Sequence, residues 1–551
     1  MDDFNRRRML KALTLVLCSS LLPSCSIFTG RDSHCENYKF DHLSKPDQDI
    51  LKLTPVIDMH AHFFNATDLL AVEYIMGPVL NDFLGSKFKF TRVLLTRVAN
   101  GIFGVLESKR KFINAGAELK WLSSNNACAP DIEYREVSAE FFDVVQQENR
   151  NKSLSFNKTQ PSMSFVDLLN ASANELSGGF QPHEKQKYKS NARIEFNANT
   201  VLNAVNSNSV YEQKTGITKG FRTFATCPSD PGFFSRIFGF VGRVLVRRST
   251  NIQAYYDRYT KKPLYEGAGV RHVMNVGCDF DFFLGTNCRT PSSSIADQIK
   301  VNEKLHEHTN GYAIPVLGVN PWKAAHDDGY CALIEAALCR GIYRGVKLYP
   351  SIGYSVTGDF RSGVQNYQCG GKGVTEKIIS TGINKIFDIV EHYKGYVTSH
   401  TTHSKGGQPG SEKLASSKHW AKILMQRKGM RINFGHMGDT GGKIGSHWRE
   451  GFLDLMLKYE NVYADFGYHE YANYQTLKSD LEVFKRYGQE LFDKITYGSD
   501  WYMISKDKGA NAYLCNSVSN FRRAVAEGII NKTQYKAMMY DNAARFLMLK
   551  S

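Results

Sequence analysis

The chain has 551 residues, of which 42% are hydrophobic and 12% aromatic, and its formal net charge is +15 at pH 7. This length and composition support a large globular core, and no segment after the amino terminus offers the ~18 uninterrupted apolar residues of a membrane-spanning helix. No compact run of Lys and Arg with interleaved aromatic residues indicates nucleic acid binding. The positive charge suits an anionic membrane surface or an acidic substrate, and it equally suits simple solubility.

Residues 1–25 have the features of an export signal. Residues 6–11 read RRRMLK, which fits the twin-arginine pattern, and an apolar stretch over residues 12–22 is too short to span a bilayer. Residues 22–25 read LPSC and resemble a bacterial lipobox, although Pro23 is an unusual occupant. We therefore expect an exported protein on the periplasmic side, anchored in the membrane through an acylated Cys25. The alternative is a basic amphipathic start of a cytoplasmic protein.

Residues 26–52 are polar and mixed in charge, and we expect them to form a tether. The segment VIDMHAH at residues 56–62 is a strand-like apolar run that ends in His-x-His. Side chains two apart in a strand point to the same side, so His60 and His62 can reach one metal ion together. For this motif alone, a pair of surface histidines is the competing interpretation. Asp58 is expected to support the two histidines from behind.

The next strand-like run is at residues 271–278, so the connection is far longer than the roughly 2–6 residues of an ordinary one. Apolar periodicity predicts helices within residues 68–84, 136–145 and 165–176. Because the insertion leaves the carboxyl end of a strand, we expect residues 66–265 to form a mostly helical cap over the site. Lateral packing or a dimer contact is the alternative.

The chain has 11 cysteines, and they lack Cys-x-x-Cys spacing, which argues against a zinc ribbon. In an oxidising compartment some of them can pair. Cys278 and Cys288 flank one loop and are the nearest candidates, but the spacing does not determine connectivity.

Six further strand-like runs follow, at residues 312–319, 345–348, 395–400, 431–438, 462–466 and 495–500. Three of them carry a residue that binds metals. His400 and Asp500 each close a run, and His436 lies within 431–438. In this order, and with the earlier His-x-His, they resemble the ligand set of a metal-dependent hydrolase barrel.

Four segments resemble the amidohydrolase superfamily, and its amidohydrolase-2 branch in particular: IDMHAH (57–62), GVKLYP (345–350), NFGHMG (433–438) and YGSDW (497–501). The likeness runs from about residue 54 to residue 547 with one long interruption, and residues 531–549 resemble the helix that closes this family's barrel. The resemblance implies a (β/α)8 TIM barrel in residues 53–65 and 266–551, with the metal at the carboxyl ends of the strands. That branch holds hydrolases, lactonases and nonoxidative decarboxylases.

The ligand types favour Zn2+, with Mn2+ or Fe2+ as alternatives, because imidazoles with one carboxylate suit these ions better than Mg2+ or Ca2+. Asp500 would also accept a proton from a metal-activated water and return it to the leaving group. His436 would be either a ligand or a group that stabilises an oxyanion. Lys347 decides between one ion and two: a carboxylated Lys347 would bridge two ions, whereas a free lysine would form a salt bridge or hold a substrate carboxylate. No organic cofactor is required.

Other residues have competing interpretations. His403, Tyr468 and His469 are candidates for substrate contact or for packing and solvation, and Trp322 and Trp501 are expected to wall the pocket. Histidines without a place at a strand end are expected to be non-catalytic, namely His272, His306, His308, His419 and His447.

The expected function is that of an exported, metal-dependent hydrolase that acts on a C–N or C–O bond of a small ester, lactone or amide. One alternative is a metal-dependent nonoxidative decarboxylase on the same barrel, and another is a binding lipoprotein with a vestigial metal site. Neither the substrate nor the oligomeric state follows from the sequence.

Overall fold

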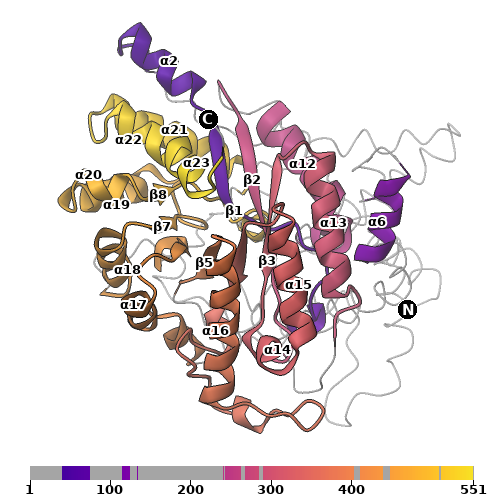
Figure 1. Ribbon diagram of the computed structural model, residues 1–551. Helices are drawn as coiled ribbons and strands as arrows, with labels where there is room; N and C mark the ends of the chain where they lie inside the picture. The colour runs from indigo at the N-terminus through magenta and orange to yellow at the C-terminus, as the bar shows by residue number, and fades with distance from the viewer. Residues whose placement is uncertain are drawn as a thin grey trace, which may run out of the picture.

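The computed structural model describes residues 40–74, 114–124, 133, 240, 242–261, 267–284, 290–402, 410–438, 447–507 and 510–549. Their centre is an eight-stranded parallel sheet in which the strands follow one another in chain order (Figure 1). The strands are β1 (Val56–Ala61), β2 (Val270–Val276), β3 (Ala313–Gly318), β4 (Gly345–Leu348), β5 (Tyr396–His400), β6 (Arg431–Gly435), β7 (Val462–Asp465) and β8 (Ile495–Thr496). The Met59 amide donates to the Tyr497 carbonyl, and Ala61 pairs with Trp501, so β1 meets the segment after β8 and closes the barrel. The predicted α/β fold, a (β/α)8 barrel, is confirmed.

Helices between the strands, and one after β8, cover the outside of the barrel (Figure 1). They are α13 (Ile295–His308), α14 (Pro321–His326), α15 (Asp328–Cys339), α16 (Glu376–His392), α17 (Ser417–Gln426), α18 (His447–Lys458), α19 (Tyr474–Arg486), α20 (Gln489–Phe492) and α21 (Tyr513–Ala526). In α16, Ile379, Ile383 and Ile386 are buried on one face, and the Thr375 side chain caps the first turn through the Ile378 amide. Each such buried side chain stabilises the fold by about 1.5–3 kcal/mol.

The amino end of the barrel is closed by the carboxyl-terminal segment. Here α22 (Lys532–Lys536), a π-helical turn (Ala537–Asp541) and α23 (Asn542–Phe546) follow one another. The Phe546 ring packs against Tyr396 at 4.9 Å and against Tyr463 at 5.3 Å, and both tyrosines lie near the starts of their strands. Residues 531–549 therefore take the position that the sequence predicts for them.

Two strands, β6 and β8, end three or more residues earlier than the sequence predicts. β6 stops at Gly435 and β8 at Thr496, so His436 and Asp500 lie beyond the strands and not within or at the end of them. Both residues have a positive φ, 67° for His436 and 56° for Asp500, which takes the chain out of the extended conformation. For residues other than glycine such a conformation is uncommon, and it is concentrated at functional sites.

The described parts of the insertion are α3 (Ala71–Tyr74), α6 (Ala115–Ser123) and α12 (Arg248–Tyr256), with a π-helical turn at Asp257–Lys261. α6 lies beside α13 on the outside of the barrel (Figure 1). The fully buried Arg248 ties these parts together, because its guanidinium donates to Glu118 at 2.7 Å and to Asp68 at 2.8 Å. The helices predicted at 136–145 and 165–176, and most of the expected cap, lie outside the described residues.

The export signal and most of the expected tether also lie outside the described residues, which begin at residue 40. The end of that tether is helical, because α2 (Lys45–Leu53) starts at the capping side chain of Ser44 and buries Leu51. Within the described ranges, no helix combines the length and the apolar character that crossing a bilayer requires.

Candidate metal centre

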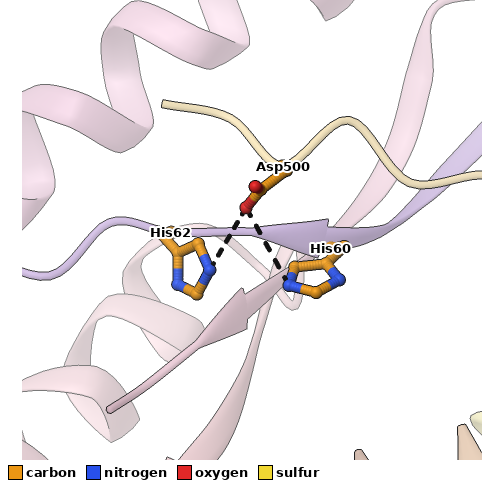
Figure 2. Close-up of side chains that lie close together, drawn as sticks. All are labelled: His60, His62 and Asp500. Atoms are coloured by element: carbon orange, nitrogen blue, oxygen red, sulfur yellow. Dashed lines mark ion pairs between the residues drawn. The ribbon is translucent and has the colours of Figure 1, made fainter. Parts of the chain in front are cut away.

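Three buried side chains converge at the carboxyl ends of the strands: His60 on β1, His62 just after it, and Asp500 after β8 (Figure 2). One donor atom from each lies within 4.8 Å of the others. The Asp500 Oδ1 atom forms an ion pair with Nε2 of His62 at 3.3 Å and lies 3.9 Å from Nε2 of His60. A buried carboxylate is costly unless a positive charge compensates it. Two imidazole nitrogens and this oxygen therefore fit a metal cation held between them.

Hydrogen bonds behind His60 and His62 determine which nitrogen faces that point. Nδ1 of His60 is 3.0 Å from a carboxylate oxygen of Asp465, and Nδ1 of His62 is 2.8 Å from the Val276 carbonyl oxygen. Carbonyl and carboxylate oxygens only accept, so both Nδ1 atoms carry the hydrogen. In the neutral rings the Nε2 lone pairs are then available to a metal ion.

His400 and His436 lie next to this group. The His436 ring centroid is 4.4 Å from that of His60, and Nε2 of His436 is 3.0 Å from Nδ1 of His400. Since Nδ1 of His436 donates to the Gly467 carbonyl at 2.8 Å, its Nε2 accepts the hydrogen of His400 Nδ1. The unprotonated nitrogen of a neutral His400 is then Nε2. The structure brings the predicted histidines together, and the assignment of His400 and His436 as ligands stays a prediction.

Lys347 lies on β4, fully inside this cluster. Its Nζ atom is 3.4 Å from Nε2 of His60, and burial lowers the pKa of its ammonium group. Asp465 and Asp500 act on Lys347 electrostatically, but among the described residues no carboxylate forms an ion pair with it. The structure therefore does not support the salt-bridge interpretation of Lys347.

Burial and contacts between the side chains determine which ionisable groups of the site are charged at neutral pH. Burial holds the pKa of His60 and His400 well below the usual value and lowers the pKa of His436 to about 3, so these imidazoles are neutral. Burial alone would also lower the pKa of His62, but hydrogen bonding to Asp500 and the contact with Cys278 raise it to about 9. Burial alone would raise the pKa of Asp500, but His62 and the other histidines lower it to about 2. The metal-free site therefore pairs a protonated His62 with an ionised Asp500.

A pH dependence of metal binding follows from the His62 pKa of about 9, which lies above the ordinary imidazole value of 6.5. In the metal-free protein the charged pair stabilises the fold fully below pH ~6.5, and this stabilisation is lost as the pH rises through about 9. A metal ion must displace the His62 proton, so we expect about one proton released per ion at pH 7 and an affinity that increases up to about pH 9. Isothermal titration calorimetry in two buffers with different ionisation enthalpies measures this release. A value of zero would contradict the assignment of the proton to His62.

Asp58 supports the site from behind, as the sequence predicts. Its Oδ1 accepts from the backbone amides of His60 at 3.1 Å and Ser499 at 2.9 Å. Its Oδ2 accepts from the Tyr255 hydroxyl of α12 at 2.6 Å. One buried carboxylate thus joins β1, the segment before Asp500 and the end of the insertion.

Asp465 is a residue of the site that the sequence analysis does not identify. It ends β7 and contacts the His60 ring with both carboxylate oxygens. An acidic residue that closes a buried strand at the same edge as the predicted ligands is a signal that the sequence does contain. That signal is weak. The predicted strand at residues 462–466 includes Asp465, but nothing in the sequence indicates that its side chain contacts His60.

The remaining residues named in the sequence analysis do not belong to the group of three metal-facing side chains. Trp501 packs against Phe63 and Tyr255, and Trp322 stacks on Phe282 at 4.3 Å. His469 is buried and its Nε2 atom donates to the His436 carbonyl at 2.9 Å, which favours packing over substrate contact. His403 and the side chain of His447 lie outside the described residues.

The disulfide between Cys278 and Cys288 that the sequence suggested as a candidate is not formed. Its thiol is free and buried beside His62, at the carboxyl end of β2, so it faces the candidate metal centre and is not bonded to Cys288. Cys369 and Cys515 are the disulfide-bonded cysteines among the described residues.

No family model matches the sequence, and no curated protein is similar to it at a significant level. Solved structures do match. A protein from Acinetobacter baumannii, assigned as a 2-pyrone-4,6-dicarboxylic acid hydrolase with citric acid bound, is 14% identical at a TM-score of 0.32, over 51% of this chain and 84% of that one. A 5-carboxyvanillate decarboxylase from Novosphingobium aromaticivorans with bound manganese is 12% identical at a TM-score of 0.34, over 51% and 78%. A protein from Lactobacillus casei assigned as a metal-dependent hydrolase is 10% identical at a TM-score of 0.35, over 65% and 89%. At these values the likeness does not assign a reaction to this chain.

Proposed function

We propose that the chain is a metal-dependent enzyme of the amidohydrolase superfamily that hydrolyses a C–N or C–O bond in a small ester, lactone or amide. The observation that carries the proposal is the convergence of His60, His62 and the buried Asp500 carboxylate at the carboxyl ends of the barrel strands, where TIM-barrel enzymes hold their active sites. Zn2+ suits this donor set best, with Mn2+ or Fe2+ as alternatives.

The residues around the ion would divide the work. When bound, the ion lowers the pKa of a coordinated water to near 7 and polarises the substrate carbonyl. Asp500 is ionised at neutral pH, because its pKa is about 2, and so can accept a proton and return it to the leaving group. His436 is neutral and is held in its unusual backbone conformation beside His60. With its hydrogen on Nδ1, its Nε2 lone pair can serve as a ligand, whereas stabilising an oxyanion would require a proton on Nε2.

The second candidate is a nonoxidative decarboxylase on the same scaffold. Lys347 favours the decarboxylase, because a buried amine beside the metal-facing nitrogen of His60 suits a substrate carboxylate. The two reactions differ in their products: hydrolysis incorporates one oxygen atom from water, whereas decarboxylation releases carbon dioxide.

Metal analysis of the purified protein, followed by assays on lactones, esters, amides and aromatic carboxylates, tests both candidates. We expect one tightly bound transition metal and turnover of a lactone, ester or amide with ¹⁸O incorporated from labelled water. Carbon dioxide release from an aromatic acid would favour the decarboxylase. If the protein binds no metal and converts none of these substrates, both enzyme proposals fail and the interpretation as a non-catalytic binding lipoprotein remains.

Lys347→Ala tests the number of ions. We expect one ion per chain in both the wild type and the variant, because the described residues hold one group of three donors and the remaining two imidazoles are hydrogen-bonded to each other. The loss in Lys347→Ala should then appear as a higher KM. Two ions that fall to one, with activity partly restored by added short carboxylates, would establish a carboxylated Lys347 bridging two metals. Inductively coupled plasma analysis counts the ions.

We propose export to the periplasmic side and anchoring through Cys25, as residues 6–25 suggest. The disulfides of Cys369 and Cys515 support an oxidising compartment. Cys25→Ala is expected to release an active protein from the membrane fraction, and Arg6→Lys with Arg7→Lys is expected to retain it in the cytoplasm. Fractionation with immunoblotting measures both effects. Wild-type protein found only in the soluble periplasmic fraction would rule out the lipid anchor and leave export standing.

A further inference from the structure

The carboxylate of Asp465, fully buried at the end of β7, lies directly behind His60. Its two oxygens are 3.0 and 3.1 Å from the Nδ1 atom of that histidine. It also accepts from the Asn433 side-chain amide at 2.7 Å and from the backbone amides of His436 at 3.1 Å and Gly467 at 2.9 Å. These hydrogen bonds come from several directions and together fix the orientation of the Asp465 carboxylate.

Three glycines from different strand ends surround the pair of Asp465 and His60. A Cβ atom at Gly467 would lie 2.9 Å from Asp465 Oδ1, and one at Gly498 would lie 3.0 Å from the same oxygen. A Cβ atom at Gly435 would lie 2.8 Å from Cε1 of His60. Each distance is too short for an unstrained side chain, so β6, β7 and β8 all leave space for this one carboxylate and this one ring.

We infer that Asp465 is a positioning residue for the metal ion. Its carboxylate holds the hydrogen of His60 on Nδ1 and aims Nε2 at Asp500, and a carboxylate behind a ligating imidazole also makes that imidazole a stronger donor. By binding the amide of His436, it places a second imidazole of the site. This inference rests on the proposed metal-dependent function.

A purely structural role makes a different prediction. If Asp465 only satisfied buried backbone amides, its loss would lower the free energy of unfolding and leave the metal affinity of the folded protein unchanged. If it positions His60, the metal affinity must fall even in variants that fold well. The measurement is therefore metal affinity, and not the activity of the loaded enzyme.

Asp465→Asn is a mild test of the charge. Asn433 Oδ1 is buried and has no hydrogen-bond partner among the described residues, so a rotated Asn433 amide can accept from the new amide at residue 465. We expect the affinity for Zn2+ to fall about 10- to 100-fold, measured by competition with a chromophoric chelator. The control is Glu118→Gln, which removes an equally buried carboxylate that binds Arg248 at 2.7 Å on the outside of the barrel. It should lower Tm and leave the Zn2+ affinity unchanged.

Gly467→Ala tests the same geometry without touching a polar side chain. The added methyl group must displace Asp465 or His60, so Zn2+ affinity should fall here too. Gly429→Ala is the matched control, because a Cβ atom there would meet no atom of the described residues within 4 Å. If Asp465→Asn does not fold, the Zn2+ affinity of Gly467→Ala tests the positioning role of Asp465 by itself.

The outcomes separate this inference from the function on which it rests. A wild-type protein that binds no metal overturns both. A wild type that binds Zn2+, with Asp465→Asn and Gly467→Ala binding equally tightly, overturns the role of Asp465 and leaves the metal-dependent function standing. A loss of affinity in these two variants and not in the two controls establishes the positioning role.

Discussion

Replacing His60 and His62 together by alanine is expected to abolish metal binding while the protein stays folded. Both Nε2 atoms of the candidate site disappear, which leaves Asp500 without a nitrogen donor beside it. Folding should survive because side chains at the carboxyl ends of barrel strands contribute to the site more than to the core. Metal content after chelation and reloading, together with circular dichroism, measures the two effects.

The structure adds a cost that a surface pair of histidines would not have. Without His60, Asp465 loses one of its partners, although Asn433 and two backbone amides still donate to it. A buried group that loses one partner costs about 1–3 kcal/mol, so we expect a lower Tm and not an unfolded chain.

A matched control is His272→Ala with His306→Ala. These imidazoles bind the carbonyls of Gly311 and Ala313 at the amino ends of the strands, away from the site. That variant should keep its full metal content. Full metal occupancy in the His60 and His62 double variant would show that the ligand assignment is wrong.

Asp500→Asn is expected to lower kcat by a factor on the order of 10² or more at saturating metal. Asparagine keeps the shape of the side chain and one oxygen for the ion, but it loses the negative charge and the proton acceptor. The charge is present at every working pH, because the pKa of Asp500 is about 2. Its stabilisation of the metal-free fold exists above 3.8, the ordinary pKa of an aspartate side chain, and is lost only as the pH falls through about 2.

The measurement is kcat on any substrate found in the panel, with metal content determined on the same sample. In Asp500→Asn, His62 also loses its charged partner, so the pKa of His62 should fall and less than one proton should be released on metal binding at pH 7. An unchanged kcat in fully loaded Asp500→Asn would remove this residue from the mechanism.

Local periodicity in the sequence was sufficient to predict the strands and to place His60 and His62 on one face. His60 and His62 share a face because side chains in a strand alternate, and that rule needs no tertiary contact. β4 has the predicted bounds, and β1, β2, β3, β5 and β7 differ from the prediction by one or two residues at an end. The predicted strands at 431–438 and 495–500 were too long. The positive φ of His436 ends β6 directly after Gly435, and β8 ends at Thr496, four residues before Asp500, without a change in apolar character that the sequence could show.

The tertiary structure alone decided what lies behind each ligand. Asp465 and His60 are 405 residues apart, and Asp58 and Ser499 are 441 apart, so no local pattern could pair them. Cys278 illustrates the same limit: its spacing suggested a disulfide, but the position of its strand in the barrel directs the thiol to His62. Residue types and strand order determine which groups reach the carboxyl edge. Only closure of the barrel determines which of them touch, because those contacts join strands that are distant in the sequence.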